Sequence, residues 1–233
     1  MLSFRRSIRP VFFGAAAALM FMLTTTRADA VSDTASSAVD RFGISVIAAV
    51  KGDGAASSPE GRYRNLSNLV SESFNLPFMM ESATGARWRS ATDDDRNRLT
   101  DAFLRMSIGT YLSRFEDYTG EYFVVMSEQP NIDGTTRVVT RLVRPRRPDL
   151  AVTYVTQKFE DGWRIIDIMF GGGISELTVR KSEFAGALSR GGLANLIVRL
   201  NEQADKMLAS LGVPDRRGGT SRAVAAGEPV LPR

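Results

Sequence analysis

The stretch from Ala151 to Phe170 constrains the fold of this chain more than any other part of the sequence. Its two halves are rich in β-branched and aromatic residues and meet at Asp161-Gly162. An Asp-Gly pair between such runs predicts a hairpin with a type I′ turn, which needs two residues that tolerate a positive φ. The second half carries large apolar residues on both faces, with Trp163, Ile165 and Met169 on one and Ile166, Ile168 and Phe170 on the other. We therefore expect this strand to be covered on both faces, or to meet an apolar ligand on one of them.

The first thirty residues have the three parts of a secretory signal peptide. Three arginines precede an apolar run from Val11 to Leu23, and Ala28-Asp29-Ala30 then provides a small-x-small cleavage site. The run is shorter than the roughly 20 residues of a transmembrane helix, although an uncleaved membrane anchor is the alternative. The sequence thus predicts a signal peptide over residues 1–30, an exported protein, and Val31 as the mature N-terminus.

The rest of the chain has the composition of one nearly neutral domain. There is no cysteine, so the stability of the predicted domain, residues 31–211, must come from its core. The whole chain has 30 basic and 26 acidic residues, but four basic and one acidic lie in the first 30 positions, and four basic and two acidic lie after Leu211. The 22 basic and 23 acidic residues between them argue against a nucleic-acid partner, which needs a clustered basic face. Residues 212–233 are predicted to be a disordered polar tail.

Apolar residues at helical spacing flank a central group of strands. The predicted helices cover residues 31–50, residues 63–76 up to an interruption at Pro77, residues 92–118, residues 174–191 and residues 193–211. Strands are predicted over residues 122–129 and 137–144 and in the two halves of the hairpin, with Gly171-Gly172-Gly173 releasing the chain from the sheet. Short connections make neighbouring strands antiparallel. The pattern predicts an α+β fold, a four-stranded curved antiparallel sheet packed on one face by N- and C-terminal helices, which can enclose an apolar pocket.

The residue types present exclude several kinds of chemistry. The chain has no histidine and no cysteine, which removes the commonest general base, the Ser-His and Cys-His nucleophiles and the commonest zinc ligands. Gly171-Gly172-Gly173 lacks the spacing of a phosphate loop. Asp93-Asp94-Asp95 follows Thr92, so we interpret it as the acidic first turn of a capped helix and not as a metal site.

Two polar features remain open. Asp167 lies inside an apolar strand, where a carboxylate can act as a general base, or is held by a nearby backbone amide or arginine. Four arginines, Arg141, Arg144, Arg146 and Arg147, gather near the predicted end of the second strand. We interpret them as a solvated strand end and loop, and the alternative is that they dock an acidic partner or lipid headgroups.

Phenylalanine and methionine are frequent in the predicted domain, and methionine adapts to irregular apolar partners. By periodicity alone these side chains favour a plain core over a ligand pocket. The residues concerned are Phe74, Phe78, Met79, Met80, Phe103, Met106, Phe123, Met126, Met169 and Phe170.

An ordered series of short motifs resembles the MlaC/toluene-tolerance family, periplasmic lipid-binding components of an ABC-type system. The motifs are Phe74-Asn75-Leu76-Pro77-Phe78-Met79, Gly85-x-x-Trp88, Tyr118-x-Gly120-Glu121, Asp161 to Ile168 (DGWRIIDI), Gly173-Ile174-Ser175, Arg180-x-x-x-Phe184 and Gly191-Gly192-Leu193. The resemblance covers most of residues 35–205. The sequence from Gly173 to Phe184 (GISELTVRKSEF) resembles the hopanoid-associated branch of the family, HpnM, more than the phospholipid branch.

The resemblance implies an NTF2-like or cystatin-like fold with a deep pocket for acyl chains, headgroups near its mouth, and a lipid as cargo with no cofactor. It implies a periplasmic, non-enzymatic carrier of phospholipid or hopanoid between an inner-membrane ABC-type complex and an outer-membrane lipoprotein complex. The candidate lipid-binding residues are Phe74, Phe78, Met79, Phe103, Met106, Tyr111, Phe123, Val125, Tyr154, Ile166, Ile168, Phe170, Leu196 and Ile197. The alternatives are an NTF2-like enzyme with Asp167 as general base on a hydrophobic substrate, or an envelope-complex adaptor that docks through the tail or residues 144–147.

Overall fold

The computed structural model describes residues 33–52, 58–171 and 173–214, so the predicted signal peptide and the tail from residue 215 lie outside the described residues. The helices are α1 (Ala35–Lys51), α2 (Pro59–Ser73), α3 (Leu76–Thr84), α4 (Ala86–Arg89), α5 (Asp93–Arg114) and α6 (Glu176–Ser210). The strands are β1 (Tyr122–Pro130), β2 (Thr135–Val143), β3 (Leu150–Phe159), β4 (Gly162–Phe170) and β5 (Ile174–Ser175). None of the helices in these ranges has the length and hydropathy that a membrane span requires.

Polar caps fix where most of the helices begin. The cap side chains that accept a backbone N–H of the first turn are Thr34, Ser58, Asn75, Thr92 and Ser175. The predicted role of Thr92, with three aspartates in the first turn of α5, is confirmed. Helix α5 ends at Arg114 and not at residue 118 as predicted, because the chain leaves helical geometry at Phe115 (φ −113°, ψ 18°). The predicted connection over residues 85–91 contains the short helix α4.

The sheet has the antiparallel order β1-β2-β3-β4-β5 in the described chain, so the prediction of four strands was one short. The chain turns back after β4 and pairs Ile174 and Ser175 with Phe170 and Met169. Gly171 (φ 47°) and Gly173 (φ 106°) have positive φ values, which allow this tight reversal. The prediction had assigned Ile174 to a helix, and α6 begins only at Glu176.

The β3–β4 hairpin exists, but its turn differs from the prediction. Phe159 pairs with Gly162, so the two-residue loop is Glu160-Asp161, one position earlier than expected. No non-glycine residue in the described chain has a positive φ, whereas Gly162 has a φ of 115°. The type I′ turn at Asp161-Gly162 was therefore wrong: the loop residues keep negative φ values and only the following glycine has a positive one.

A β-bulge in β4 breaks the expected alternation of its side chains. Val155 pairs with Asp167 and Thr156 with Ile165, which leaves Ile166 as an extra residue. Ile165 and Ile168 therefore both join the core, although a strict period of two had placed them on opposite faces. In β2 and β3, by contrast, buried and more exposed residues alternate, as expected for a sheet covered on one face.

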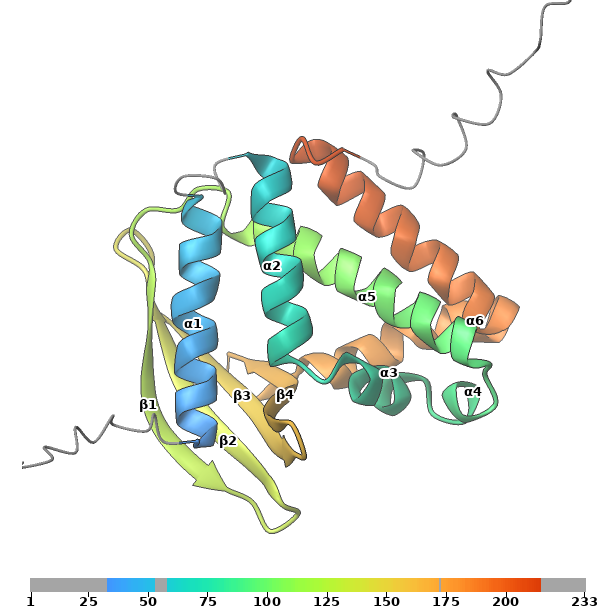
Figure 1. The fold of residues 1–233 in the computed structure, drawn as a ribbon, viewed down its shortest axis with the longest axis horizontal. Helices are drawn as coiled ribbons and strands as arrows, with labels where there is room; N and C mark the ends of the chain where they lie inside the picture. Colours follow the sequence, from blue (N-terminus) through green and yellow to red (C-terminus); the bar gives the residue numbers. More distant parts are fainter. Residues whose placement is uncertain (1–32, 53–57, 172, 215–233) are drawn as a thin grey trace, which may run out of the picture. The chain divides into compact units, whose positions relative to one another are not determined.

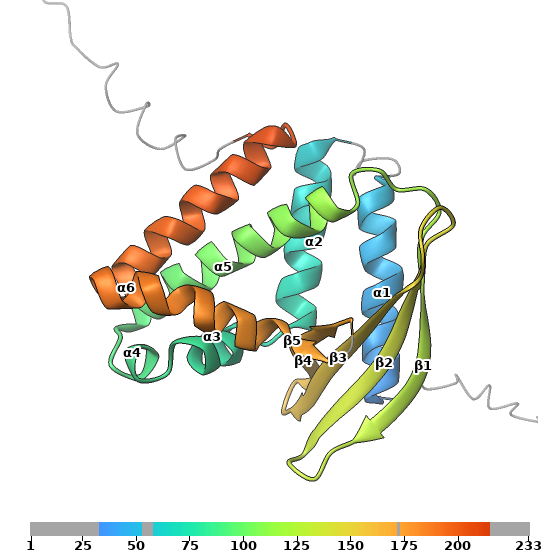
Figure 2. The ribbon, with the colours of Figure 1, turned by 180° about the vertical axis from the view of Figure 1, so that it is seen from behind.

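The core lies between this sheet and the helices. Helix α1 packs along the sheet, mainly against β1, and α5 lies beside the C-terminal part of α6 (Figures 1 and 2). Helix α6 consists of two helical parts, because Gly191 (φ −162°, ψ 23°) and Gly192 (φ 63°, ψ −154°) are not helical. This confirms the predicted break near Gly191-Gly192, and Figure 2 shows the change of direction.

Candidate functional site

A cavity of about 480 Å³ lies between the inner face of the sheet, the α2–α3 junction, α5 and the start of α6. Its volume falls in the range of small-molecule binding sites. The apolar and aromatic side chains that line it are Val70, Phe74, Leu76, Met79, Phe103, Tyr111, Phe115, Phe123, Leu142, Leu150, Val152, Tyr154, Ile168 and Phe170. Most of them are buried or half-buried, so the interior of the cavity is predominantly apolar.

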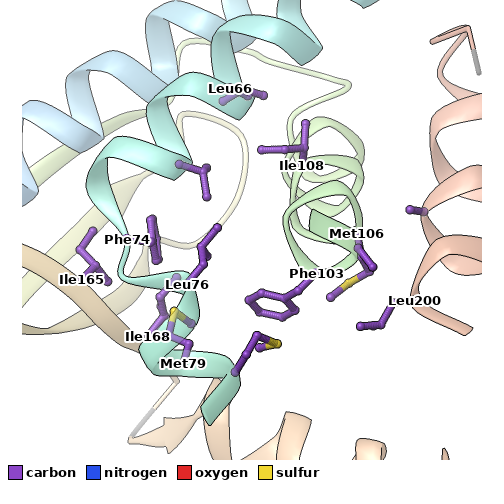
Figure 3. Close-up of a cluster of buried hydrophobic side chains, with 14 of the residues drawn as sticks. Leu66, Phe74, Leu76, Met79, Phe103, Met106, Ile108, Ile165, Ile168 and Leu200 are labelled. Atoms are coloured by element: carbon purple, nitrogen blue, oxygen red, sulfur yellow. The ribbon is translucent and has the colours of Figure 1, made fainter. Parts of the chain in front are cut away.

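The junction between α2 and α3 is fixed to the sheet next to this cavity. The backbone N–H of Asn75 donates to the carbonyl of Ile165 (2.9 Å), and Phe74 bridges to the same residue. Because Asn75 also caps α3, the short segment from Phe74 to Met79 changes direction at a defined point. Figure 3 shows Phe74, Leu76 and Met79 from this segment beside Ile168 and facing Phe103 of α5.

Phe42 of α1 supports three aromatic residues of the cavity wall from behind. Its ring makes edge contacts with the rings of Phe74 (5.2 Å between centroids), Tyr111 (6.2 Å) and Tyr154 (5.8 Å). Such edge-to-face pairs restrict ring orientation. Phe42 is only 1% exposed, so these four rings form one packed group that joins α1, the end of α2, α5 and β3.

Burial keeps the two tyrosines of the wall uncharged. Desolvation raises the pKa of Tyr111 and of Tyr154 well above the usual tyrosine value, and for Tyr111 the nearby guanidinium of Arg114 opposes the shift without cancelling it. An exposed tyrosine is also protonated at physiological pH, and burial extends the protonated range of these two hydroxyls to higher pH. They add hydrogen-bonding groups to the cavity without adding charge.

Charged residues surround the opening of the cavity. They are Arg114, Arg144, Arg147 and Arg180 with Glu116, Asp117, Glu121 and Glu176, all exposed or half-buried. Arg180 is paired with Glu176 (2.7 Å) and with Glu183 (2.8 Å). Arg114 lies over the ring of Phe170, 4.9 Å from its centroid. The site as a whole is amphipathic, with an apolar interior and a charged mouth.

The structure brings together eight of the fourteen residues predicted from the sequence. The cavity is lined by Phe74, Met79, Phe103, Tyr111, Phe123, Tyr154, Ile168 and Phe170. The other six do not line it: Phe78, Met106, Val125, Ile166, Leu196 and Ile197. Phe78 packs on Phe159 instead (6.1 Å), Ile166 is the bulge residue, and Figure 3 shows Met106 directed toward Leu200 of α6.

Several lining residues were missed by the sequence interpretation. Leu142 and Val152 lie on the buried faces of β2 and β3, and Val152 shares its face with Tyr154, so strict alternation along the strands was a sufficient signal for them. Leu76 was missed because it lies next to Pro77, where the predicted helix was interrupted. The charged residues of the mouth carried no periodic signal, apart from the arginines near the end of the second strand.

Those arginines divide between two roles. Arg144 and Arg147 line the cavity, whereas Arg146 does not, and Arg141 pairs with Asp149 (3.8 Å). Nε of Arg144 donates to the carbonyl of Pro148 (2.7 Å). The interpretation as a solvated loop thus holds for Arg146, while Arg144 and Arg147 belong to the mouth.

Asp167 is held by neighbouring donors and does not line the cavity. Its carboxylate accepts hydrogen bonds from the Oγ of Ser175 (2.5 Å) and from the backbone N–H groups of Leu177 (3.0 Å) and Ile168 (2.8 Å). The interpretation as a carboxylate held by a nearby backbone amide is confirmed. Among the residues that the structure describes, no group of three His, Cys, Asp or Glu side chains is arranged to hold a metal ion.

Comparisons with known proteins agree with this architecture. A solved structure of the phospholipid-binding protein from Ralstonia solanacearum, in complex with a phospholipid, is similar with a TM-score of 0.64 and 22% identity over 74% of this chain and 98% of that chain. At this identity the likeness concerns the fold. None of the curated proteins matches this chain. The model of the family described as MlaC protein matches residues 43–202, which is more than half of the sequence. The chain therefore belongs to the MlaC family.

Proposed function

We propose that this protein is a non-enzymatic lipid carrier that holds acyl chains in the cavity between α5 and the sheet. The observation that carries this proposal is the amphipathic site: fourteen apolar or aromatic side chains line the interior, and charged side chains surround the mouth. An acyl chain gains about 0.8 kcal/mol for each CH₂ group that leaves water, so a cavity of this kind stabilises a lipid in aqueous surroundings.

Phospholipid is the cargo that we propose. The solved structure with a similar fold contains a phospholipid, and the arginines at the mouth suit a phosphate group. The alternative cargo is a hopanoid, because the sequence of residues 173–184 resembles the hopanoid-associated branch. Identification of the bound lipid distinguishes a hopanoid from a phospholipid.

We further propose that the carrier works in the periplasm, exported by a signal peptide over residues 1–30. It would shuttle lipid between an inner-membrane ABC-type complex and an outer-membrane lipoprotein complex, with no cofactor and no nucleic-acid partner. The description of the fold as NTF2-like, with sheet and helices around a pocket, belongs to the same proposal. Its support is the membership of the MlaC family and the amphipathic cavity.

Native mass spectrometry of the mature protein, purified from periplasm, tests the carrier directly. A discrete adduct, identified after organic extraction, would name the cargo as phospholipid or hopanoid. A protein that remains at its apo mass after incubation with lipid vesicles would contradict the proposal.

A substitution that fills the cavity tests where the lipid binds. Ser107 of α5 lines the cavity and is half-buried, so a Ser107→Trp side chain occupies space that an acyl chain would need. We expect this variant to lose most of its bound lipid while its helical circular dichroism is retained. The matched control is Ser71→Trp, because Ser71 is exposed on α2 and does not line the cavity. Equal lipid loading in both variants would place the lipid elsewhere.

A further inference from the structure

The mouth of the cavity carries unpaired charges of both signs. Arg180 is paired there with Glu176 and also with Glu183. The remaining charged residues of the mouth are three arginines, Arg114, Arg144 and Arg147, and three carboxylates, Glu116, Asp117 and Glu121. Within the part of the chain that the structure describes, none of these six forms an ion pair within 4.0 Å. Oppositely charged groups that surround one opening without pairing leave room for a ligand that carries both charges.

Two neighbouring loops hold these groups beside each other. The carboxylates follow the end of α5, and Arg144 and Arg147 lie in the β2–β3 turn. The pairing of Tyr122 with Val143 brings Glu121 next to the start of that turn, and a Cβ atom at Gly120 would lie 3.7 Å from the side chain of Pro145. The two loops therefore form one rim.

Local hydrogen bonds hold parts of this rim in place. The N–H of Arg147 donates to the carbonyl of Arg144 (3.1 Å), which closes the turn. The carboxylate of Glu121 accepts from the N–H (2.6 Å) and the Oγ1 (3.0 Å) of Thr119. Although desolvation raises the pKa of Glu121, the hydrogen bonds from Thr119 and from the backbone of Gly120 and Glu121 together outweigh it, and the pKa lies below its usual value.

We infer that the mouth selects a zwitterionic phospholipid headgroup, which carries a phosphate and an ammonium group as phosphoethanolamine does. Arg114, Arg144 and Arg147 face the phosphate. Glu116, Asp117 and Glu121 face the ammonium group. This inference rests on the proposed carrier function and names the class of lipid that the same cavity accepts. A purely anionic headgroup satisfies only the arginines and brings its charge near three carboxylates. A neutral lipid satisfies neither set.

The test is a competition between lipids that differ only in their headgroups. Delipidated protein is incubated with vesicles of dioleoyl phosphatidylethanolamine and dioleoyl phosphatidylglycerol in equal amounts, with a minor fraction of dioleoylglycerol. Native mass spectrometry then gives the bound lipids relative to their share in the vesicle. We expect the relative loading of phosphatidylethanolamine to be about two- to fivefold higher than that of phosphatidylglycerol. The relative loading of phosphatidylglycerol should in turn be about two- to fivefold higher than that of dioleoylglycerol, because a partly exposed ion pair usually contributes this much.

Paired substitutions separate the two halves of the site. In Arg144→Gln/Arg147→Gln, we expect both phospholipids to fall toward the level of dioleoylglycerol. In Glu116→Gln/Asp117→Asn, only the preference for phosphatidylethanolamine over phosphatidylglycerol should disappear. The controls, Arg146→Gln on the same turn and Asp101→Asn on α5, alter residues that do not line the cavity and should leave the lipid ratios unchanged.

The outcomes distinguish this inference from the carrier proposal. If all three lipids load in proportion to their share in the vesicle, the carrier function stands and the headgroup inference is overturned. It is also overturned if either double variant keeps the lipid ratios of the original protein. If no lipid loads at all, the carrier proposal itself fails.

Discussion

Asp167 holds the first turn of α6 against β4. Its carboxylate accepts from the Oγ of Ser175, which is also the N-cap of α6, and from the backbone N–H of Leu177. A negative charge at a helix N-terminus is favourable, because it lies at the positive end of the helix dipole. Since the N-terminal part of α6 brings Glu176 and Arg180 to the cavity, this single carboxylate positions one side of the mouth.

We predict that Asp167→Asn lowers the free energy of unfolding by about 1 kcal/mol, because the amide keeps an acceptor but loses the charge. Urea denaturation measures this change. Asp161→Asn is the control, since the side chain of Asp161 is 65% exposed and its ion pair with Arg164 contributes little. Lipid loading should persist in both variants. Its loss in a folded Asp167→Asn variant would show that lipid binding depends on the position of the first turn of α6, which carries Glu176 of the mouth.

Phe103 and Met106 show why only part of the site could be predicted at the residue scale. Both lie on the apolar stripe of α5, and helical periodicity identifies the stripe correctly. The stripe is wide enough to meet two different neighbours, however: Phe103 faces the cavity, while Met106 packs toward α6 (Figure 3). Periodicity gives the buried face of a helix, and only tertiary packing decides what that face contacts.

The two-part helix α6 is the element with the clearest sequence signal. Gly191-Gly192 interrupted an otherwise apolar helical pattern, and the structure has its non-helical residues at these positions. The bulge at Ile166 had no comparable signal, because apolar residues occupy both faces of β4 and no glycine or proline marks the extra residue. Backbone irregularities could thus be predicted where glycine permits them, but not where tertiary pairing imposes them.

Gly192 has a backbone conformation, φ 63° and ψ −154°, that is essentially restricted to glycine. A Cβ atom there would meet no neighbour within 4 Å, so the cost of a side chain is conformational and not steric. We predict that Gly192→Ala loses about 1–3 kcal/mol of stability, measured by thermal unfolding. Gly186→Ala is the matched control: Gly186 lies inside the N-terminal part of α6, and the substitution should gain about 0.5–1 kcal/mol. Equal effects at both positions would contradict the assigned break.

At the scale of the whole molecule, the order of elements largely determined the layers. Short connections between four β-rich segments predicted an antiparallel meander, and the helices before and after it had to cover the sheet. The cavity was harder to predict, because the same apolar residues fill a core or surround a space according to how closely α5 approaches the sheet. Tyr111 and Tyr154 illustrate this, since they pack on Phe42 from one side and line the cavity with the other.

These two tyrosines also make the stability of the domain depend on pH in the alkaline range. Because burial raises their pKa values, the folded state keeps both protons above about pH 10, where exposed tyrosines of the unfolded chain lose theirs. The unfolded state then binds fewer protons, so their contribution to stability is complete below about pH 10 and decreases as the pH rises, by about 1.4 kcal/mol per pH unit for each group. We therefore expect Tm to fall more steeply between about pH 10 and pH 11 in the original protein than in Tyr111→Phe/Tyr154→Phe. Tyr122→Phe, at a tyrosine that is 52% exposed, should keep the original slope. A double variant with that same slope would show that other groups govern alkaline unfolding.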